Sequence, residues 1–81
     1  MKRSFNNISK LIRDSRLDLG LSQGELAAKI GCHGQFISNI ERGKCSVPAK
    51  DLNTISVALM VSREKIKRAM INDYEAYLNE L

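Results

Sequence analysis

The stretch QGELAAKIGCHGQFISNIER, residues 23–42, determines the predicted fold. In each half of it, apolar residues recur three or four positions apart, as they do on the buried face of a helix. The apolar residues are Leu26, Ile30, Cys32, Ile37 and Ile40. Gly31 stands between the halves, and glycine adopts the left-handed conformation that ends helices at little cost. The stretch therefore predicts two short helices joined by a tight turn.

The other face of the second helix carries small or polar residues that are mostly uncharged. These residues are His33, Gly34, Gln35, Ser38 and Asn39. Such a face packs poorly, but an amide side chain presents a donor and an acceptor together, as a base edge does. Gln35 and Asn39 lie four residues apart, and either could pair with adenine through two hydrogen bonds. We therefore expect these five residues to read bases in double-stranded DNA.

The same stretch resembles the helix-turn-helix of the lambda-repressor and Cro-like (XRE-type) family. That family has glutamine at the start, alanine within the first helix and glycine at the turn, which here are Gln23, Ala27 and Gly31. The resemblance covers about residues 8–61, and includes the wider frame LGLSQGELAAKIG...ISNIERGK. It implies an all-α domain of about five helices that regulates transcription. Small members of this kind include phage Cro-like repressors, antitoxins and restriction–modification controller proteins.

The resemblance also implies a set of phosphate contacts beside the recognition helix. In the family, a glutamine at the position of Gln23 binds a backbone phosphate, and residues after a glycine like Gly43 follow the phosphates. The predicted phosphate-side residues are Ser22, Gln23, Phe36, Arg42, Lys44, Ser46 and Lys50. A solvated helix start and a solvated loop are the alternatives.

Two residues depart from the family pattern. Phe36 replaces a small residue, so it could contact DNA at a thymine methyl or pack on the preceding helix. Gly34 replaces a side chain that usually reads a base. One base position would then be read weakly, or the backbone would approach the DNA more closely.

Arg16 and Glu41 match an ion pair that, in the family, joins the first helix to the end of the recognition helix. The alternative is two unrelated surface charges. If the pair is buried, loss of one partner is expected to cost about 3–5 kcal/mol.

Periodicity and capping signals predict five helices within one domain, residues 1–81. The expected helices cover about 5–19, 23–30, 33–42, 48–59 and 63–81, of which 5–62 form the core. Ser22 and Glu25 have the spacing of a capping box, and Pro48 suits the first turn of a helix. Leu19 is expected on the buried face of the first helix.

The last helix carries more apolar surface than a core of this size is expected to cover. Ile66, Met70, Tyr74, Tyr77 and Leu81 are spaced by four, four, three and four residues. We expect its first turns to join the core and the rest to form a homodimer interface. The interface residues are predicted to be Met70, Tyr74, Tyr77, Leu78 and Leu81. The alternative is a helix that folds back across the first helix.

Charge favours a polyanionic partner. The chain has 13 Lys and Arg residues against nine acids, for a net charge of +4. All 13 lie in residues 1–70 with six acids, whereas residues 71–81 carry three acids and no base. The basic part should meet DNA, where Lys2 and Arg3 form either a contacting arm or a solvated terminus. The acidic tail should face away from it.

The inventory of reactive residues favours binding over catalysis. One histidine and two cysteines are too few for an evident metal site, and no catalytic arrangement or phosphate-binding glycine loop is recognisable. Cys32 is expected to fill the core and Cys45 to lie in a polar loop. We expect no cofactor, no metal, no small-molecule ligand and no enzyme activity. No run of residues is apolar enough for a membrane span, so a cytoplasmic, nucleoid-associated protein of a bacterium or phage is expected.

These observations predict a sequence-specific double-stranded DNA-binding regulator, expected to act as a repressor by binding an inverted repeat as a homodimer. The alternative is an antitoxin-type or other protein-interaction module, in which the apolar last helix would bind a partner protein.

Overall fold

The computed structural model describes residues 4–81, so Lys2 and Arg3 of the predicted basic arm lie outside the described residues. The helices are α1 (Asn6–Asp18), α2 (Gln23–Ile30), α3 (Gly34–Glu41), α4 (Leu52–Leu59) and α5 (Arg63–Asn79). A 3-10 turn, η1 (Ala49–Asp51), precedes α4. Residues 4–81 contain no β-strand. The predicted all-α, five-helix fold is confirmed.

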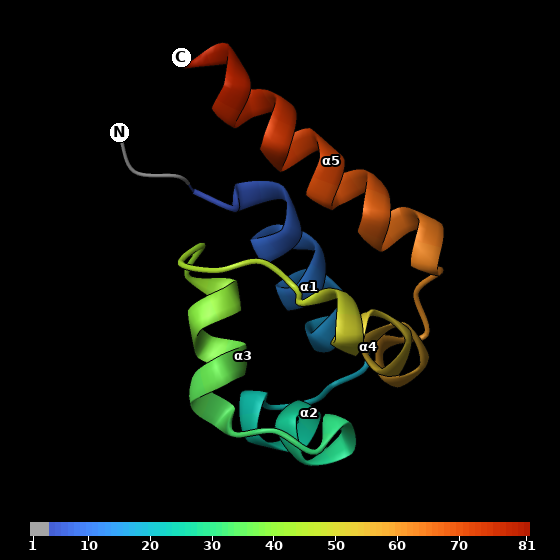
Figure 1. Ribbon diagram of the computed structural model, residues 1–81. Coiled ribbons are helices and arrows are strands. Elements are labelled where there is room, and N and C mark those ends of the chain that lie inside the picture. Colours follow the sequence, from blue (N-terminus) through green and yellow to red (C-terminus); the bar gives the residue numbers. More distant parts are fainter. Residues whose placement is uncertain (1–3) are drawn as a thin grey trace.

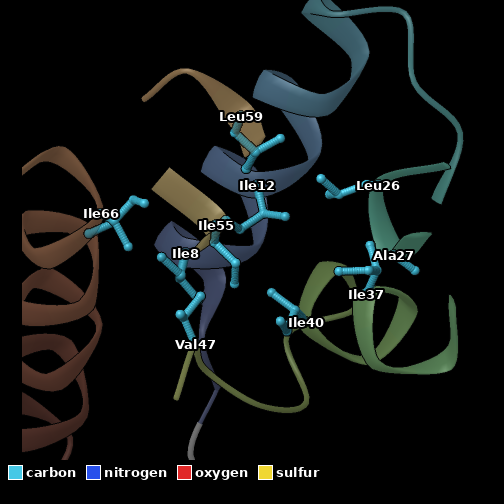
Figure 2. Close-up of a cluster of buried hydrophobic side chains, with 11 residues drawn as sticks. Ile8, Ile12, Leu26, Ala27, Ile37, Ile40, Val47, Ile55, Leu59 and Ile66 are labelled. Carbon is cyan, nitrogen blue, oxygen red and sulfur yellow. The ribbon is translucent and has the colours of Figure 1, made fainter. Parts of the chain in front are cut away.

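Helix α1 is the central element of the molecule (Figure 1). It packs against α5 on one side and against α3 on another, while α4 contacts α1, α2 and α5. Figure 2 shows Ile8 and Ile12 of α1 at the centre of the core, with Ile66 of α5 on one side and Leu26 of α2 on the other. The buried hydrophobic residues are aliphatic: Ile8, Ile12, Leu26, Ala27, Ile37, Ile40, Val47, Ile55, Leu59, Ile66 and Ala69. The paired helices α2 and α3 are thereby anchored by their inner faces.

Local signals set the ends of α2 and α3. The Ser22 hydroxyl accepts from the Glu25 amide at 3.0 Å, and the Glu25 carboxylate accepts from the Ser22 amide at 2.9 Å. This confirms the predicted capping box. Gly31 ends α2 with φ of +82°, in the left-handed region that favours glycine. Gly43 follows α3 with φ of +75°, and a Cβ there would lie 3.3 Å from the Asn6 side-chain oxygen. The turn and the close approach both require glycine.

Two local predictions need correction. Leu19 is 39% exposed as the C-cap residue of α1, which ends at Asp18. Pro48 opens the 3-10 turn η1, and α4 itself begins only at Leu52. Cys45 lies in the loop after α3, as predicted, and there it also packs against the core.

The first two residues of the predicted apolar seam, Ile66 and Met70, join the core as expected, but the buried line of α5 then passes through residues outside the seam. Its buried residues are Ile66, Ala69 and Asp73. The body of α5 therefore lies against α1, as in the alternative interpretation, while Tyr74 is 48% exposed. A polar contact that the apolar pattern could not reveal also joins α5 to α1.

That contact is made by Asp73, which is only 2% exposed. Its Oδ1 accepts from the Asn7 amide at 2.7 Å and from the Asn7 side chain at 3.0 Å, and its Oδ2 accepts from the Ile8 amide at 3.0 Å. The first amides of a helix have no partner within the helix and carry partial positive charge. Asp73 therefore caps α1 from α5. From the sequence, it had been counted only with the acidic tail.

Candidate nucleic-acid interface

Helix α3 separates its apolar residues from its predicted base-reading residues. Ile37 and Ile40 are fully buried in the core. The predicted reading residues lie along the rest of the helix: His33 is its N-cap residue, and Gly34, Gln35, Ser38 and Asn39 follow within it. His33 and Gln35 are exposed, whereas Gly34, Ser38 and Asn39 are half-buried. The helix is thus held by one face and presents amides and a hydroxyl on the other.

The amide side chains on this face contact one another. The Gln35 Nε2 donates to Asn39 Oδ1 at 3.0 Å, and an Arg42 guanidinium nitrogen donates to the same oxygen at 2.9 Å. Residues three or four apart on a helix are neighbours, which explains these contacts. Arg42, predicted on the phosphate side, therefore also touches the reading face.

The end of α3 is fixed by the buried carboxylate of Glu41. Arg16 donates to both carboxylate oxygens, at 2.7 Å from Nε and 2.8 Å from Nη2, and both side chains are buried. Arg16 also donates to the Leu21 carbonyl at 2.7 Å. The Ser9 hydroxyl donates to the Glu41 backbone carbonyl. The interpretation of Arg16 and Glu41 as unrelated surface charges is therefore excluded.

The charges of this pair are mutually stabilised. Burial raises the pKa of the Glu41 carboxyl, but hydrogen bonds from Arg16 and Gln23 outweigh burial, so its pKa lies below the ordinary value of 4.5. Hydrogen bonding to Glu41 likewise raises the pKa of Arg16. Both groups are charged at neutral pH, and their contact fastens α1 to α3.

Gln23 joins this cluster from α2. Its Nε2 donates to Glu41 Oε1 at 3.2 Å, and its side chain is half-buried. The contact brings the first turn of α2 next to the last turn of α3, where Arg42 is exposed. The amides of a first turn favour an anion. The structure therefore brings together two of the segments predicted to face phosphates.

The remaining predicted phosphate-side residues have different surroundings. Ser22, Lys44 and Lys50 are exposed, and Ser46 is half-buried in the loop after α3. Phe36 is half-buried and packs against the core, as its alternative interpretation foresaw. The Ser22 hydroxyl is engaged in the capping box.

Gly34 has no role in the fold that requires glycine. It lies in the first turn of α3, and a Cβ added there would meet nothing within 4 Å. Glycine in a helix costs up to about 1 kcal/mol relative to alanine. The small residue therefore leaves open space on the reading face at some cost in helix stability.

The predicted interface residues of α5 are partly covered. Met70 packs against the core, and Tyr77 is half-buried beside Tyr74, with ring centroids 6.4 Å apart. Leu78 and Leu81 are 44% and 78% exposed. The exposed large apolar residues of α5 are thus Ile71, Tyr74 and Leu78, and Leu81 is exposed just after the helix.

Within residues 4–81, no three His, Cys, Asp or Glu side chains are grouped so that they could hold a metal ion. Cys32 and Cys45 are both free thiols, and burial raises the pKa of each. In the same range of residues, no helix is long and apolar enough to cross a bilayer.

A polar-faced helix held across a preceding helix by a glycine turn defines the helix-turn-helix class. A family model described as "Helix-turn-helix domain" matches residues 8–69. The chain therefore belongs to the helix-turn-helix domain family, and the predicted lambda-repressor-like, XRE-type membership is confirmed.

Solved structures of regulators have the same fold. The wild-type restriction–modification controller protein C.Esp1396I is 29% identical, with a TM-score of 0.68, and the match covers 89% of this chain and 94% of that one. SinR, described as the master regulator for biofilm formation and solved in complex with DNA, is 33% identical, with a TM-score of 0.67, covering 73% and 95%. The controller protein C.AhdI from Aeromonas hydrophila shares the fold at 24% identity and a TM-score of 0.70, covering 76% and 90%.

The sequence did not reveal two buried polar residues that join α1 to other helices. Asp73 caps α1 across 66 residues of sequence, and Ser9 bonds to the end of α3 across 32. The sequence does contain one sign that Asp73 is buried. Asp73 lies seven residues after Ile66 and four after Ala69, so it falls on the same face of the helix as these apolar residues.

Proposed function

We propose that this chain is a sequence-specific regulator of transcription that binds double-stranded DNA, with α3 in the major groove. The observation that carries the proposal is the division of α3 between a buried apolar face and a face of amides and a hydroxyl. The first turn of α2 and the loop after α3 would hold the flanking phosphates and set the register. Membership of the family and the likeness to SinR, which was solved with DNA, support this proposal.

Salt dependence of binding tests the phosphate contacts. Affinity for a mixed-sequence duplex should fall steeply with salt, because each phosphate contact releases counterions. Lys44→Ala should reduce the slope of log affinity against log salt by about 1. Lys65→Ala is the matched control, since Lys65 is an exposed cation on α5. Equal slopes for the wild-type protein and both variants would contradict the assigned phosphate side.

The variant Gly34→Ala tests whether glycine at this position serves DNA binding and not folding. The added methyl group meets open space in the free protein and favours helix, so the variant should be as stable as the wild-type protein or more stable. If the α3 backbone approaches DNA closely here, affinity should fall. A variant with higher stability and unchanged affinity would mean that the DNA does not approach Gly34.

The proposed regulator acts as a homodimer, and its dimer interface is the end of α5. Exposed Leu78 and Leu81 support this assignment. A two-fold dimer would place two α3 helices about 34 Å apart, over an inverted repeat. A dimer bound within a promoter would block polymerase, which makes repression the proposed action.

Matched substitutions test the interface by analytical ultracentrifugation. Leu81→Glu should shift the protein toward monomer, whereas Val57→Glu should not, although Val57 on α4 is similarly exposed at 71%. Dimer loss in Val57→Glu alone would place the interface on α4. A wild-type monomer that lacks salt-dependent DNA binding would favour the second candidate function, in which the exposed end of α5 binds a different protein.

A further inference from the structure

The hydrogen bonds within the reading face limit what Asn39 can offer to a base. A carboxamide oxygen has two lone pairs, and Asn39 Oδ1 already accepts one hydrogen bond from Gln35 and one from Arg42, at 3.0 and 2.9 Å. Its acceptor capacity is therefore used within the protein. The Asn39 Nδ2 group, with two hydrogens, remains as the donor.

Gln35 is limited less. It uses one of its two amide hydrogens toward Asn39 and keeps its own carbonyl oxygen and the second hydrogen. It therefore retains the donor and acceptor pair that matches the N7 and N6 atoms of adenine. The two amides on one helix face, which look equivalent in the sequence, differ in hydrogen-bonding character.

We propose that Gln35 and Arg42 lock Asn39 as a hydrogen-bond donor, so that this position selects a keto base, guanine or thymine, over adenine or cytosine. Guanine presents two acceptors in the major groove, O6 and N7, and thymine presents O4. Adenine presents its N7 acceptor beside an amino donor, and cytosine presents only an amino donor, so a side chain that can only donate finds fewer acceptors on either of them. An amino group opposite the locked Asn39 would meet a donor and stay unpaired. This inference rests on the proposed function and adds the base class that one residue reads.

The lock also gives Arg42 a second role, as a positioning residue for Asn39. One guanidinium N–H is used on Asn39, and the other four donors remain for a phosphate. Lys44 is exposed two residues later, and only its backbone amide contacts Asn39, through the Asn39 carbonyl. Lys44 therefore serves as a control for the loss of a nearby positive charge.

The test is selection of duplexes from a random pool by the wild-type protein and by Asn39→Ala. The position that loses its preference in Asn39→Ala is the one that Asn39 reads, and the wild-type motif should carry guanine or thymine there. Binding is then measured on four duplexes that differ only at this base pair. The wild-type protein should prefer the selected keto base over adenine by roughly tenfold.

Substitution of the residues that hold Asn39 should change the ratio of the affinities for the keto-base and adenine duplexes. The double variant Gln35→Ala with Arg42→Ala frees the Asn39 oxygen, so adenine should gain on the keto base until the preference disappears or reverses. Lys44→Ala should weaken binding to all four duplexes alike. Asn39→Asp, which has no donor at neutral pH, should lose the keto preference while the fold is retained, as checked by circular dichroism.

The possible outcomes distinguish failure of the proposed donor role of Asn39 from failure of the proposed DNA binding, on which that role rests. Adenine or cytosine at the Asn39-dependent position of the wild-type motif would overturn the lock and leave DNA binding intact. An unchanged ratio in the double variant would overturn it as well. Failure of the folded wild-type protein to enrich any motif would overturn the proposed function itself.

Discussion

The two ends of α1 are each fastened by a buried carboxylate, but the partners differ. At the C-terminal end, Glu41 of α3 meets the full positive charge of Arg16 and also the Gln23 amide. At the N-terminal end, Asp73 of α5 meets only amides, those of Asn7 and Ile8. The first contact ties α1 to the helices that carry the proposed reading face. The second ties it to the helix that carries the proposed dimer interface.

Each part of the molecule therefore depends on a different one of these two contacts. Breaking the Glu41 cluster should loosen α2 relative to α3, and with it the geometry on which phosphate and base contacts would depend. Breaking the Asp73 cap should release α5 and leave the helix-turn-helix in place. Loss of the Asp73 contact should therefore affect stability and dimerisation, whereas loss of the Glu41 contacts should also affect DNA binding.

The largest effect is expected for Arg16→Ala. It leaves Glu41 buried without its cation, and removal of one partner of a buried pair costs about 3–5 kcal/mol. Chemical denaturation should show this loss in the free energy of unfolding, with DNA affinity falling in parallel. Arg13→Ala is the control, because the Arg13 side chain is 47% exposed. Equal stability of the two variants would contradict the importance of the pair.

The same pair predicts a dependence of stability on pH. The pKa of folded Glu41 lies below 4.5, so the unfolded chain binds more protons there. Its contribution is complete above that value and is lost as pH falls through the lower, folded pKa. Glu41→Gln should be less stable at neutral pH and should show a weaker loss below pH 4.5 than the wild-type protein. Parallel stability curves for the two proteins would refute this linkage.

Asp73→Ala should cost about 2 kcal/mol, because it leaves helix amides of α1 without an acceptor. Asp73→Asn keeps one acceptor oxygen and should lose less. Hydrogen exchange should rise in α5 and the first turn of α1, while α2 and α3 stay protected. Uniform loss of protection over all helices would mean that α5 and the helix-turn-helix unfold together.

The smallest effect is expected for the local cap of α2. Ser22→Ala removes one side of the capping box and should cost about 1 kcal/mol. Ser22→Asp, which can also cap, should retain most of the stability in thermal unfolding. A cost as large as that of Asp73→Ala would show that Ser22 does more than cap α2.

Features with short-range causes could be predicted from the sequence. The capping box of Ser22 and the left-handed Gly31 depend on neighbouring residues, and both were foreseen. The Arg16–Glu41 pair followed from the resemblance, because spacing alone does not bring residues 25 positions apart together. Asp73 could not be foreseen, since its role depends on how α5 lies against α1. The hydrogen bonds on Asn39 also required coordinates, because the spacing of Gln35 and Arg42 does not show which group each side chain contacts.

The most direct test of sequence-specific DNA binding is selection of bound duplexes from a random pool by the wild-type protein. The proposal predicts an enriched inverted repeat with half-sites about one helical turn of DNA apart. One enriched half-site would keep base reading by α3 and contradict the dimer. No enriched sequence, from protein shown to be folded, would contradict sequence-specific DNA binding.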